Sequence, residues 1–514
     1  MRQLIQLFGK IIEPTAKRFD RALNRPQLIQ EFVQREICDR LIKSEYGKSL
    51  KIQSVADWQR IPIVDYDCLK PWILGKENEQ RRRIPLTPEP ILFYEKTSGS
   101  TGAIKWIPYT RSLRKSFNQM FCIWAYDLIQ NGPNFSTGKL YACISPQLNL
   151  PDFQPENTLS LQDDLDYLDS WLRWVLHPWL VMPKNLKNLH NINTFKHQLS
   201  LALLQAEDLE IISIWSPSFL QIHLKYIQNN QALFQKELQN KISYKRLKIL
   251  SEPQINWQQL WSNLKLISCW DAINAADGAK DLRSQFPQVL VQGKGLLATE
   301  APMTIPLIEA NGYVPLIDEV FFEFEDDRSE IYKLDELSIN QEYTIILSQK
   351  GGLYRYRIGD RIRVTSIYHQ TPCLEFLGRA TAISDLVGEK LQENFVCHSL
   401  ADLNLPETSF KTLIPVTNPP HYLLLLDRAK ETPETLAKNL DIALSKSPQY
   451  QRARLLTQLT PPEVFISPRI PELLALDGVR SGRIWGSIKY PILTTKPMTD
   501  EFFARLKFQL QSNS

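Results

Sequence analysis

The sequence predicts an α/β protein that has a large N-terminal domain of mixed sheets and helices and a smaller α+β domain at the C-terminus. The chain has 514 residues, which is more than one domain usually holds. Residues 211–215 have the pattern of a strand, 216–218 of a short polar turn and 219–226 of a helix, as in a parallel sheet. After Gly388 short strands alternate with helices. We therefore expect domains at residues 1–386 and 387–514.

The composition excludes several classes of protein. The net charge is only +4, so neither a nucleic-acid nor a membrane-surface partner is expected. The seven cysteines are odd in number and include no Cys-x-x-Cys pair, which indicates free thiols in a reducing compartment. The histidines show no metal-ligand spacing. Because no signal peptide and no long apolar run is evident, we expect a cytoplasmic protein. The composition does not predict the oligomeric state.

The N-terminal elements follow from hydrophobic periodicity. Residues 1–50 and 112–130 have helical spacing of apolar residues, and 91–94 and 140–144 have the pattern of strands. Residues 61–64 resemble a short strand before a helix start. Residues 145–163 are rich in Pro, Asn and Asp and predict a long loop near the mouth of a site. For Trp171, Trp174 and Trp179, core packing is the simplest expectation.

The remaining elements continue the alternation and then change character. Helix and strand patterns follow at 257–261, 264–270, 289–291 and 296–298, and residues 320–325 and 343–348 predict antiparallel strands. In the C-terminal part, strands are expected at 413–416 and 421–426 and helices at 435–444 and 500–511. The stretch 378–388 contains two glycines and is a candidate hinge.

The most informative motif is Thr97-Ser98-Gly99-Ser100-Thr101-Gly102, with Lys105 three residues further on. Glycines let several backbone N–H groups turn toward one anion, while hydroxyls and a lysine add donors and charge. The motif therefore predicts a loop that binds nucleotide phosphates, although it lacks the spacing of a P-loop. A surface turn of small residues is the alternative.

Two further motifs add carboxylates. Thr299 and Glu300 follow a predicted strand, and Mg²⁺ prefers one or two carboxylates together with phosphate oxygens. Asp360 follows Gly359 after a basic and aromatic strand, which we expect to place its carboxylate at a turn where it could accept from ribose hydroxyls. A plain strand-end turn and a hairpin with Arg–Asp pairing are the respective alternatives.

The phosphate loop resembles that of the adenylate-forming superfamily, Thr-Ser-Gly-Ser-Thr-Gly-x-Pro-Lys, with Ile104 in place of the proline. The order of residues 266–270, 293–300, 353–360, 371–379 and 384–391 resembles the acyl acid amido synthetases. This family includes the plant auxin- and jasmonate-conjugating enzymes of the Gretchen Hagen type and bacterial relatives. The resemblance extends from about residue 20 to the C-terminus.

The resemblance implies a role for each matching residue. The loop residues 97–102 and Thr299 would contact the nucleotide phosphates, Lys105 would act in catalysis, and Glu300 would hold Mg²⁺. Asp360 and Arg379 would bind the ribose or a phosphate. Lys489 would contact the α-phosphate and the substrate carboxylate from the small domain. Lys496 is the second candidate for that role, and a solvated surface lysine is the alternative.

Besides Ile104, four positions depart from the family pattern. Leu296 replaces an aromatic residue that would stack on adenine, and Leu297 replaces a glycine. Thr381 stands where the hinge aspartate is usual, and Ile492 where an arginine follows the proline.

The acid-binding residues are expected at or just after predicted strand ends. The candidates are Trp215, Ser216, Phe219 and Trp270, followed by Asp271. Their aromatic character favours an aromatic or other bulky apolar acid. The same side chains could instead belong to the core.

Three functions remain open. The first is an ATP- and Mg²⁺-dependent ligase that activates a small carboxylic acid as an acyl-adenylate and transfers it to an amine, typically an amino acid. The second transfers the acyl group to a thiol, either of coenzyme A or of a protein. The third is a nucleotide-binding protein that has lost catalysis. Lys105, Glu300, Asp360 and Arg379 argue against the third, because binding alone does not need a carboxylate for Mg²⁺.

Overall fold

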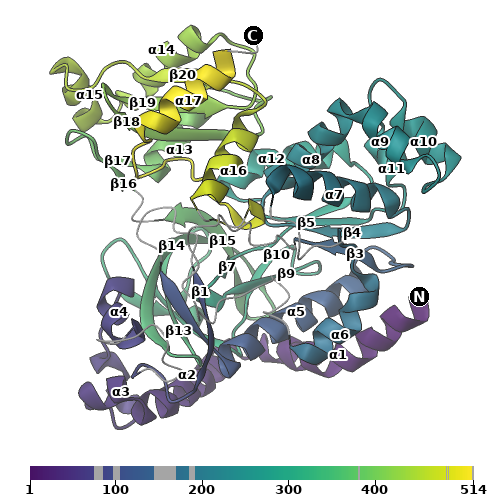
Figure 1. Ribbon diagram of the computed structural model, residues 1–514. Helices are drawn as coiled ribbons and strands as arrows, with labels where there is room; N and C mark the ends of the chain where they lie inside the picture. The colour runs from purple at the N-terminus through teal and green to yellow at the C-terminus, as the bar shows by residue number, and fades with distance from the viewer. Residues whose placement is uncertain are drawn as a thin grey trace.

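A computed structural model of the chain describes residues 1–74, 85–96, 105–143, 169–183, 191–379, 383–481, 483 and 485–511. It confirms the predicted α/β class with an α+β arrangement at the C-terminal end (Figure 1). The loop motif 97–104, the expected loop 145–163 and Thr381 lie outside the described residues.

Helices form the N-terminal part, as predicted. Helices α1 (Arg2–Ala22), α2 (Pro26–Lys43) and α3 (Glu45–Ser49) are followed by the 3-10 helix η1 (Val55–Arg60) and by α4 (Tyr66–Leu74). Helix α1 packs along α5 (Arg111–Asn131) through Phe8 and Ile12. The hydroxyl of Thr110 accepts from the N–H of Leu113 and caps α5. The short strand expected at 61–64 is reduced to a single bridge at Val64.

A four-stranded parallel sheet forms the centre of the large part. Its order is β3 (Lys139–Ala142), β4 (Leu209–Ser213), β5 (Leu266–Cys269) and β6 (Leu290–Gly293). Helices α7 (Ile192–Gln205), α8 (Pro217–Asn229) and α12 (Ala276–Gln285) cover one face, and α5 lies on the other (Figure 1). Such a sheet presents the carboxyl ends of its strands together, which is where open α/β sheets bind ligands.

The expected core packing of the three tryptophans is wrong for two of them. Trp179 is buried, but Trp171 and Trp174 are exposed, at 44% and 80%. Helix α6 (Ser170–Leu176) buries Leu172 and Leu176, which are four residues apart and therefore share one face. Trp171 and Trp174 lie on the opposite side of that helix.

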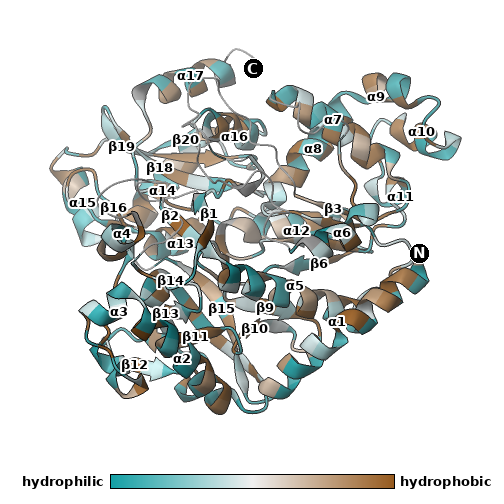
Figure 2. Cartoon of the chain, turned by 60° about the horizontal axis from the view of Figure 1, so that its bottom comes forward, coloured by the Kyte–Doolittle hydropathy of each residue, from teal (hydrophilic) through white to brown (hydrophobic). Residues whose placement is uncertain are grey.

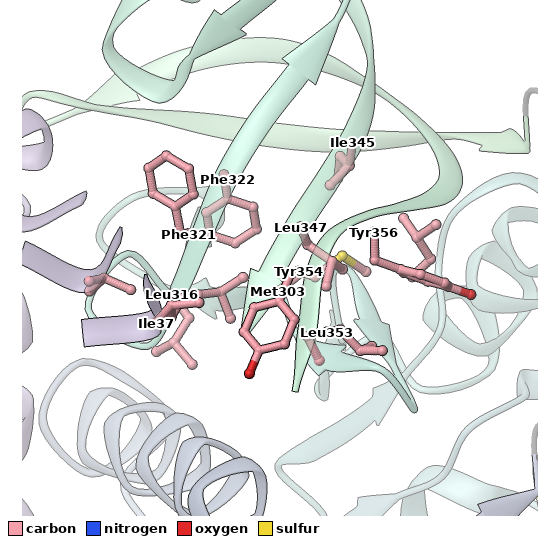
Figure 3. Packing of buried hydrophobic residues seen from close by; sticks show 14 of the residues in the cluster. Ile37, Met303, Leu316, Phe321, Phe322, Ile345, Leu347, Leu353, Tyr354 and Tyr356 are labelled. Atoms are coloured by element: carbon pink, nitrogen blue, oxygen red, sulfur yellow. The ribbon is translucent and has the colours of Figure 1, made fainter. Parts of the chain in front are cut away.

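The second sheet of the large part is antiparallel. Its order is β12 (Ile331–Lys333), β11 (Val320–Glu325), β13 (Glu342–Gln349), β14 (Leu353–Tyr368) and β15 (Thr371–Arg379), so the strands predicted at 320–325 and 343–348 are confirmed as antiparallel partners. Phe321, Phe322, Leu347 and Tyr354 pack together on this sheet (Figure 3). Short two-stranded pairs stand beside it: β1 (Ile91–Lys96) with β2 (Trp106–Thr110), β7 (Leu297–Ala298) with β8 (Ala301–Pro302), and β9 (Thr304–Leu307) with β10 (Gly312–Pro315).

The C-terminal part has its own sheet. Strand β19 (Pro420–Leu426) pairs antiparallel with β18 (Lys411–Thr417) and parallel with β20 (Glu463–Ile466). Helices α13 (Glu393–Ala401), α14 (Pro433–Leu444), α15 (Pro448–Leu455) and α17 (Asp500–Gln511) surround it, and the short pair β16 (Ile383–Ser384) and β17 (Leu391–Gln392) precedes it. Helix α16 (Ile470–Arg480) continues to the 3-10 helix η7 (Trp485–Ser487).

Hydropathy colouring shows polar and apolar residues interspersed along the helices (Figure 2). None of the helices in the described part of the chain combines the length and the hydropathy that a membrane crossing would need. All seven cysteines are free thiols, and six are wholly or partly buried.

Candidate active site

One cavity lies where the carboxyl ends of the parallel strands face the C-terminal part. Its walls come from the turn after β4, the segment after β5, β7, the middle of β14, the end of β15 and the segment after η7. Its lining residues include Ser216, Trp270, Leu296, Asp360, Arg379 and Lys489. Residues more than 200 positions apart in the chain therefore meet around one space.

Lys105 and Glu300 meet on one tyrosine. The Lys105 ammonium donates to the Tyr356 hydroxyl at 3.3 Å, and that hydroxyl donates to a Glu300 carboxylate oxygen at 3.4 Å. Glu300 is buried. Burial and then the charge of Glu300 raise the pKa of Tyr356, so its hydroxyl stays protonated and acts as a donor. The neutral Tyr356 hydroxyl thus joins Lys105, the predicted catalytic lysine, to Glu300, the predicted metal ligand.

Asp360 and Arg379 form a cross-strand pair. They stand opposite each other on β14 and β15, and the Arg379 Nε donates to an Asp360 oxygen at 3.2 Å. Asp360 is the main cause of the raised pKa of Arg379. The expected turn at Asp360 is wrong, because β14 continues through it to Tyr368. Gly359 instead has a φ of +84° at an irregularity in the β13–β14 register, and this β-bulge aims the carboxylate.

Lys489 enters the cavity from the C-terminal part. Its ammonium lies 5.0 Å from the ring centre of Trp270, and its side chain keeps an exposed surface. Loss of surrounding water lowers the pKa of Lys489, and repulsion by Arg379 lowers it further, while Asp360 and Glu300 oppose the shift. Lys489 therefore interacts electrostatically with Arg379, Asp360 and Glu300, the three charged residues that the sequence predicts beside it.

The expected acid-binding residues divide into two groups. Ser216 and Trp270 line the cavity, and the half-buried Trp215 packs against Trp270 with ring centres 5.7 Å apart. Phe219 is 3% exposed and packs in the core against Trp485, away from the cavity wall. Trp270 and Ser216 therefore have the access to a ligand that Phe219 lacks.

Leu296 occupies the place of the expected aromatic residue. It lines the cavity, and its backbone N–H donates to the Thr304 hydroxyl at 2.7 Å. Gly295 just before it has a φ of +66°, a conformation that favours glycine. The cavity wall at this position is therefore apolar but not aromatic. The backbone oxygen of Thr299 accepts from the Tyr109 hydroxyl. This bond holds the backbone of Thr299, which is a predicted phosphate contact.

Sequence reasoning missed two residues of the site. Tyr356 belongs to a basic and aromatic strand, and nothing in its pattern separates it from its neighbours. Glu393 is buried at the start of α13 and accepts from the N–H of Ile492 at 3.0 Å. Burial raises its pKa, while N–H groups of Leu493, Ile492 and Arg379 oppose that shift. Glu393 thus connects the segment that carries Lys489 to the end of β15. The sequence pattern at Glu393 is that of an ordinary helix start and gave no signal of this role.

Three family models match the chain: the GH3 family N-terminal domain at residues 15–291, the central domain at 313–379 and the C-terminal domain at 392–497. The indole-3-acetic acid-amido synthetase GH3.2 of Arabidopsis thaliana is 22% identical over 435 residues, covering 72% of this chain and 76% of that protein.

Two solved structures share the fold. The acyl acid amido synthetase AtGH3.15 in complex with 2,4-DB superposes with a TM-score of 0.79 at 16% identity, covering 97% of this chain and 96% of that one. The 2-hydroxyisobutyryl-CoA ligase in its postadenylation state has a TM-score of 0.52 at 13% identity, covering 96% and 93%. The family models, which together span most of the sequence, show that this chain belongs to the GH3 family.

Proposed function

We propose that the protein activates a carboxylic acid with ATP as an acyl-adenylate and then transfers the acyl group to an amine, typically an amino acid. The observation that carries the proposal is the convergence of Lys105, Glu300, Asp360, Arg379 and Lys489 on one region of a GH3-family fold. Relatives that conjugate indole-3-acetic acid or jasmonic acid with amino acids support the same reaction class.

The charges explain how the first step would be assisted. A carboxylate that attacks the α-phosphate of ATP brings two anions together, so the barrier contains a large repulsive term. Lys105, Arg379 and Lys489 are cations that would offset this repulsion once they surround the phosphates. Asp360 would accept from the ribose hydroxyls while Arg379 keeps its carboxylate oriented.

Glu300 has the chemistry that Mg²⁺ requires. It offers a buried carboxylate oxygen, which is a hard ligand, and the described residues contain no cluster of three metal-binding side chains. One protein carboxylate with phosphate oxygens and water is a usual magnesium environment, and the ion would supply further positive charge to the phosphates. Tyr356 would keep the carboxylate in position.

The acceptor step needs little from the protein. AMP is a good leaving group, and a cavity closed by the C-terminal part would keep water away from the mixed anhydride. We propose that residues 1–386 bind ATP and the acid and that residues 387–514 close over them. A thiol acceptor is the second candidate, because the fold is shared with a CoA ligase.

ATP–pyrophosphate exchange across a panel of carboxylic acids, measured without any amine, tests the first step. Exchange with one class of acid would establish adenylation. Addition of amino acids or of coenzyme A would then distinguish an amine from a thiol acceptor by the product formed. Clear ATP binding without exchange for any acid would overturn the proposal in favour of a nucleotide-binding protein.

A further inference from the structure

Asp271 lies in the cavity wall directly after Trp270, at the carboxyl edge of the parallel sheet. Its two carboxylate oxygens have different partners. The Tyr313 hydroxyl donates to Oδ1 at 2.5 Å, and Nη2 of Arg283 on α12 donates to Oδ2 at 3.2 Å. Burial and then the charge of Asp271 raise the pKa of Tyr313, so the tyrosine hydroxyl stays protonated and remains a donor.

The segment after β6 makes room for this carboxylate. A Cβ at Gly293 would overlap both the Tyr313 hydroxyl and Oδ1 of Asp271, and a Cβ at Gly295 would overlap the Tyr313 ring. Glycines at these two positions therefore let the tyrosine lie against the backbone and hold Asp271 in one orientation.

The Asp271–Arg283 ion pair extends from the cavity toward the surface. The Asp271 side chain is 17% exposed and lines the cavity, while that of Arg283 is 46% exposed. A carboxylate accepts up to about four hydrogen bonds, and the described residues supply one to each Asp271 oxygen. Through Nη2, Arg283 donates to Asp271 and to the Val291 backbone oxygen, and its other nitrogens carry further N–H groups. Both ends of the pair therefore keep the capacity to bind a ligand.

An α-amino acid complements such a pair. It is a zwitterion at neutral pH, so its ammonium group can donate to Asp271 while its carboxylate accepts from Arg283. Because the ion pair and the ligand are each neutral overall, every charge in the complex has a partner of opposite sign. The amino group would then lie beside Trp270, whose ring centre is 5.0 Å from the Lys489 ammonium.

We propose that Asp271 and Arg283 bind the acyl acceptor as an α-amino acid zwitterion, with its amino group in the cavity and its carboxylate toward the surface. This inference rests on the proposed function, because it takes Lys489 to mark the carboxyl group that is activated. An amine without the α-carboxylate would engage Asp271 alone and bind less tightly. The same pair offers a thiol acceptor no complementary charge.

Calorimetric binding to the full-length protein, with and without AMP, tests this assignment. The probes are three matched pairs, each an amino acid and the amine that lacks its α-carboxylate: L-phenylalanine with phenethylamine, L-leucine with 3-methylbutylamine, and L-aspartate with β-alanine. For at least one pair we expect the amino acid to bind about tenfold more tightly, as a charged hydrogen bond of roughly 1.5 kcal/mol implies.

Arg283→Met keeps an apolar stem and removes the charge. We expect it to abolish the preference for the amino acid, with the amine bound at least as tightly as by the wild type because Asp271 loses a competing cation. Lys280→Met, at an exposed position on the same helix, is the matched control and keeps the preference.

Asp271→Asn keeps the shape of the side chain and removes the negative charge. We expect it to weaken binding of the amine by about tenfold, because the ammonium group loses its charged acceptor. The amino acid should weaken as well, since it uses the same acceptor.

Four outcomes would overturn the assignment: equal binding of both members of each pair, binding of no probe, an intact preference in Arg283→Met, or undiminished amine binding in Asp271→Asn. The last result would mean that Asp271 only orients Arg283. Because binding needs no chemistry, an intact preference without pyrophosphate exchange for any acid would contradict the proposed function and leave this site in place.

Discussion

At the scale of single residues, a buried carboxylate, a phenol and an ammonium form one chain of contacts. Glu300 accepts from Tyr356, which in turn accepts from Lys105. Burial of a polar group costs free energy unless the group finds a hydrogen-bond partner that replaces water. Each of these three groups provides such a partner for its neighbour. The order of donors leaves the Glu300 carboxylate as the final acceptor in this chain of contacts.

Glu300→Gln should separate metal binding from folding. The amide keeps the shape of the side chain and can still accept from Tyr356, so the free energy of unfolding should change by no more than about 1 kcal/mol. The loss of a charged oxygen ligand should lower the ATP–pyrophosphate exchange rate by about 100-fold or more. Exchange rates at several Mg²⁺ concentrations would measure this.

Glu309→Gln changes the charge equally at an exposed position and serves as the control, with wild-type exchange expected. Undiminished turnover in the Glu300 variant would refute the metal role of that carboxylate.

At the scale of elements, two strands of the large part contain features with different roles. Strand β14 contains the bulge at Gly359, which aims Asp360 toward the cavity. Near the start of strand β4, Glu210 is a buried carboxylate that accepts from the N–H groups of Ser136, Thr137 and Gly138 and from Lys265. The bulge positions a predicted ligand contact, and the Glu210 contacts hold the start of the sheet together.

Gly359→Ala should disturb both stability and nucleotide binding. A side chain at a φ of +84° costs about 1–2 kcal/mol, and the strand would relax by turning Asp360 away. We expect a lower urea midpoint and a several-fold higher KM for ATP in the exchange assay.

Gly388→Ala is the control. Gly388 has a φ of +101°, and a Cβ added there would meet open space, so this variant should lose similar stability with an unchanged KM. Equal KM changes in both variants would mean that strain alone, and not the aim of Asp360, affects ATP.

Glu210 should make the stability of the sheet depend on acid. Burial alone would raise its pKa, but Lys265 and the N–H groups of Gly138 and Ser136 lower it from 4.5 to about 2. A lowered folded-state pKa means that the stabilisation is complete above about pH 4.5 and is lost as the pH falls toward 2. The size of the shift corresponds to roughly 3 kcal/mol.

Glu210→Gln should therefore be less stable than the wild type at pH 7, and the gap should close as the pH falls from 4.5 toward 2. Urea unfolding at a series of pH values would show this. Glu434→Gln, exposed on α14, should follow the wild-type profile throughout. A constant gap between the Glu210 variant and the wild type would contradict the ionic role.

At the scale of the whole molecule, the C-terminal segment is packed into the large part. Ala475, Val479, Trp485 and Ile488 belong to the same hydrophobic cluster as Phe195 of α7. The ring of Trp485 contacts Phe219 and stacks on His223, both on α8. Lys196 on α7 also pairs with Glu472 on α16. The domain boundary at 386/387 remains a prediction, and this segment binds the two sides of it together.

Trp485→Ala should therefore destabilise the large part although the residue lies near the C-terminus. Trp485 is 4% exposed, and truncation of such a side chain costs about 3–5 kcal/mol. Urea unfolding followed by far-ultraviolet circular dichroism would measure the loss. Trp174→Ala removes an 80% exposed ring and should change stability by less than about 0.5 kcal/mol. Similar midpoints for both variants would show that the C-terminal segment contributes no packing energy.

Most elements could be predicted because their signals are local. Helix α5, the strands around residues 211, 266 and 320 and the alternation after Gly388 each follow from periodicity within one short window. The exposed Trp171 and Trp174 could not be predicted, since composition does not say which face of a short helix meets the core. The turn expected at Asp360 was wrong because a glycine within a strand can form a bulge as well as an end.

The sequence by itself determined the family, the α/β class and the residues whose chemistry suits adenylation, because motif order and hydrophobic periodicity are properties of the linear chain. Only the tertiary structure decided that Tyr356 joins Lys105 to Glu300 and that Glu393 holds the Lys489 segment. These contacts join residues far apart in the chain, and whether such groups meet depends on how sheets and helices pack rather than on any local pattern.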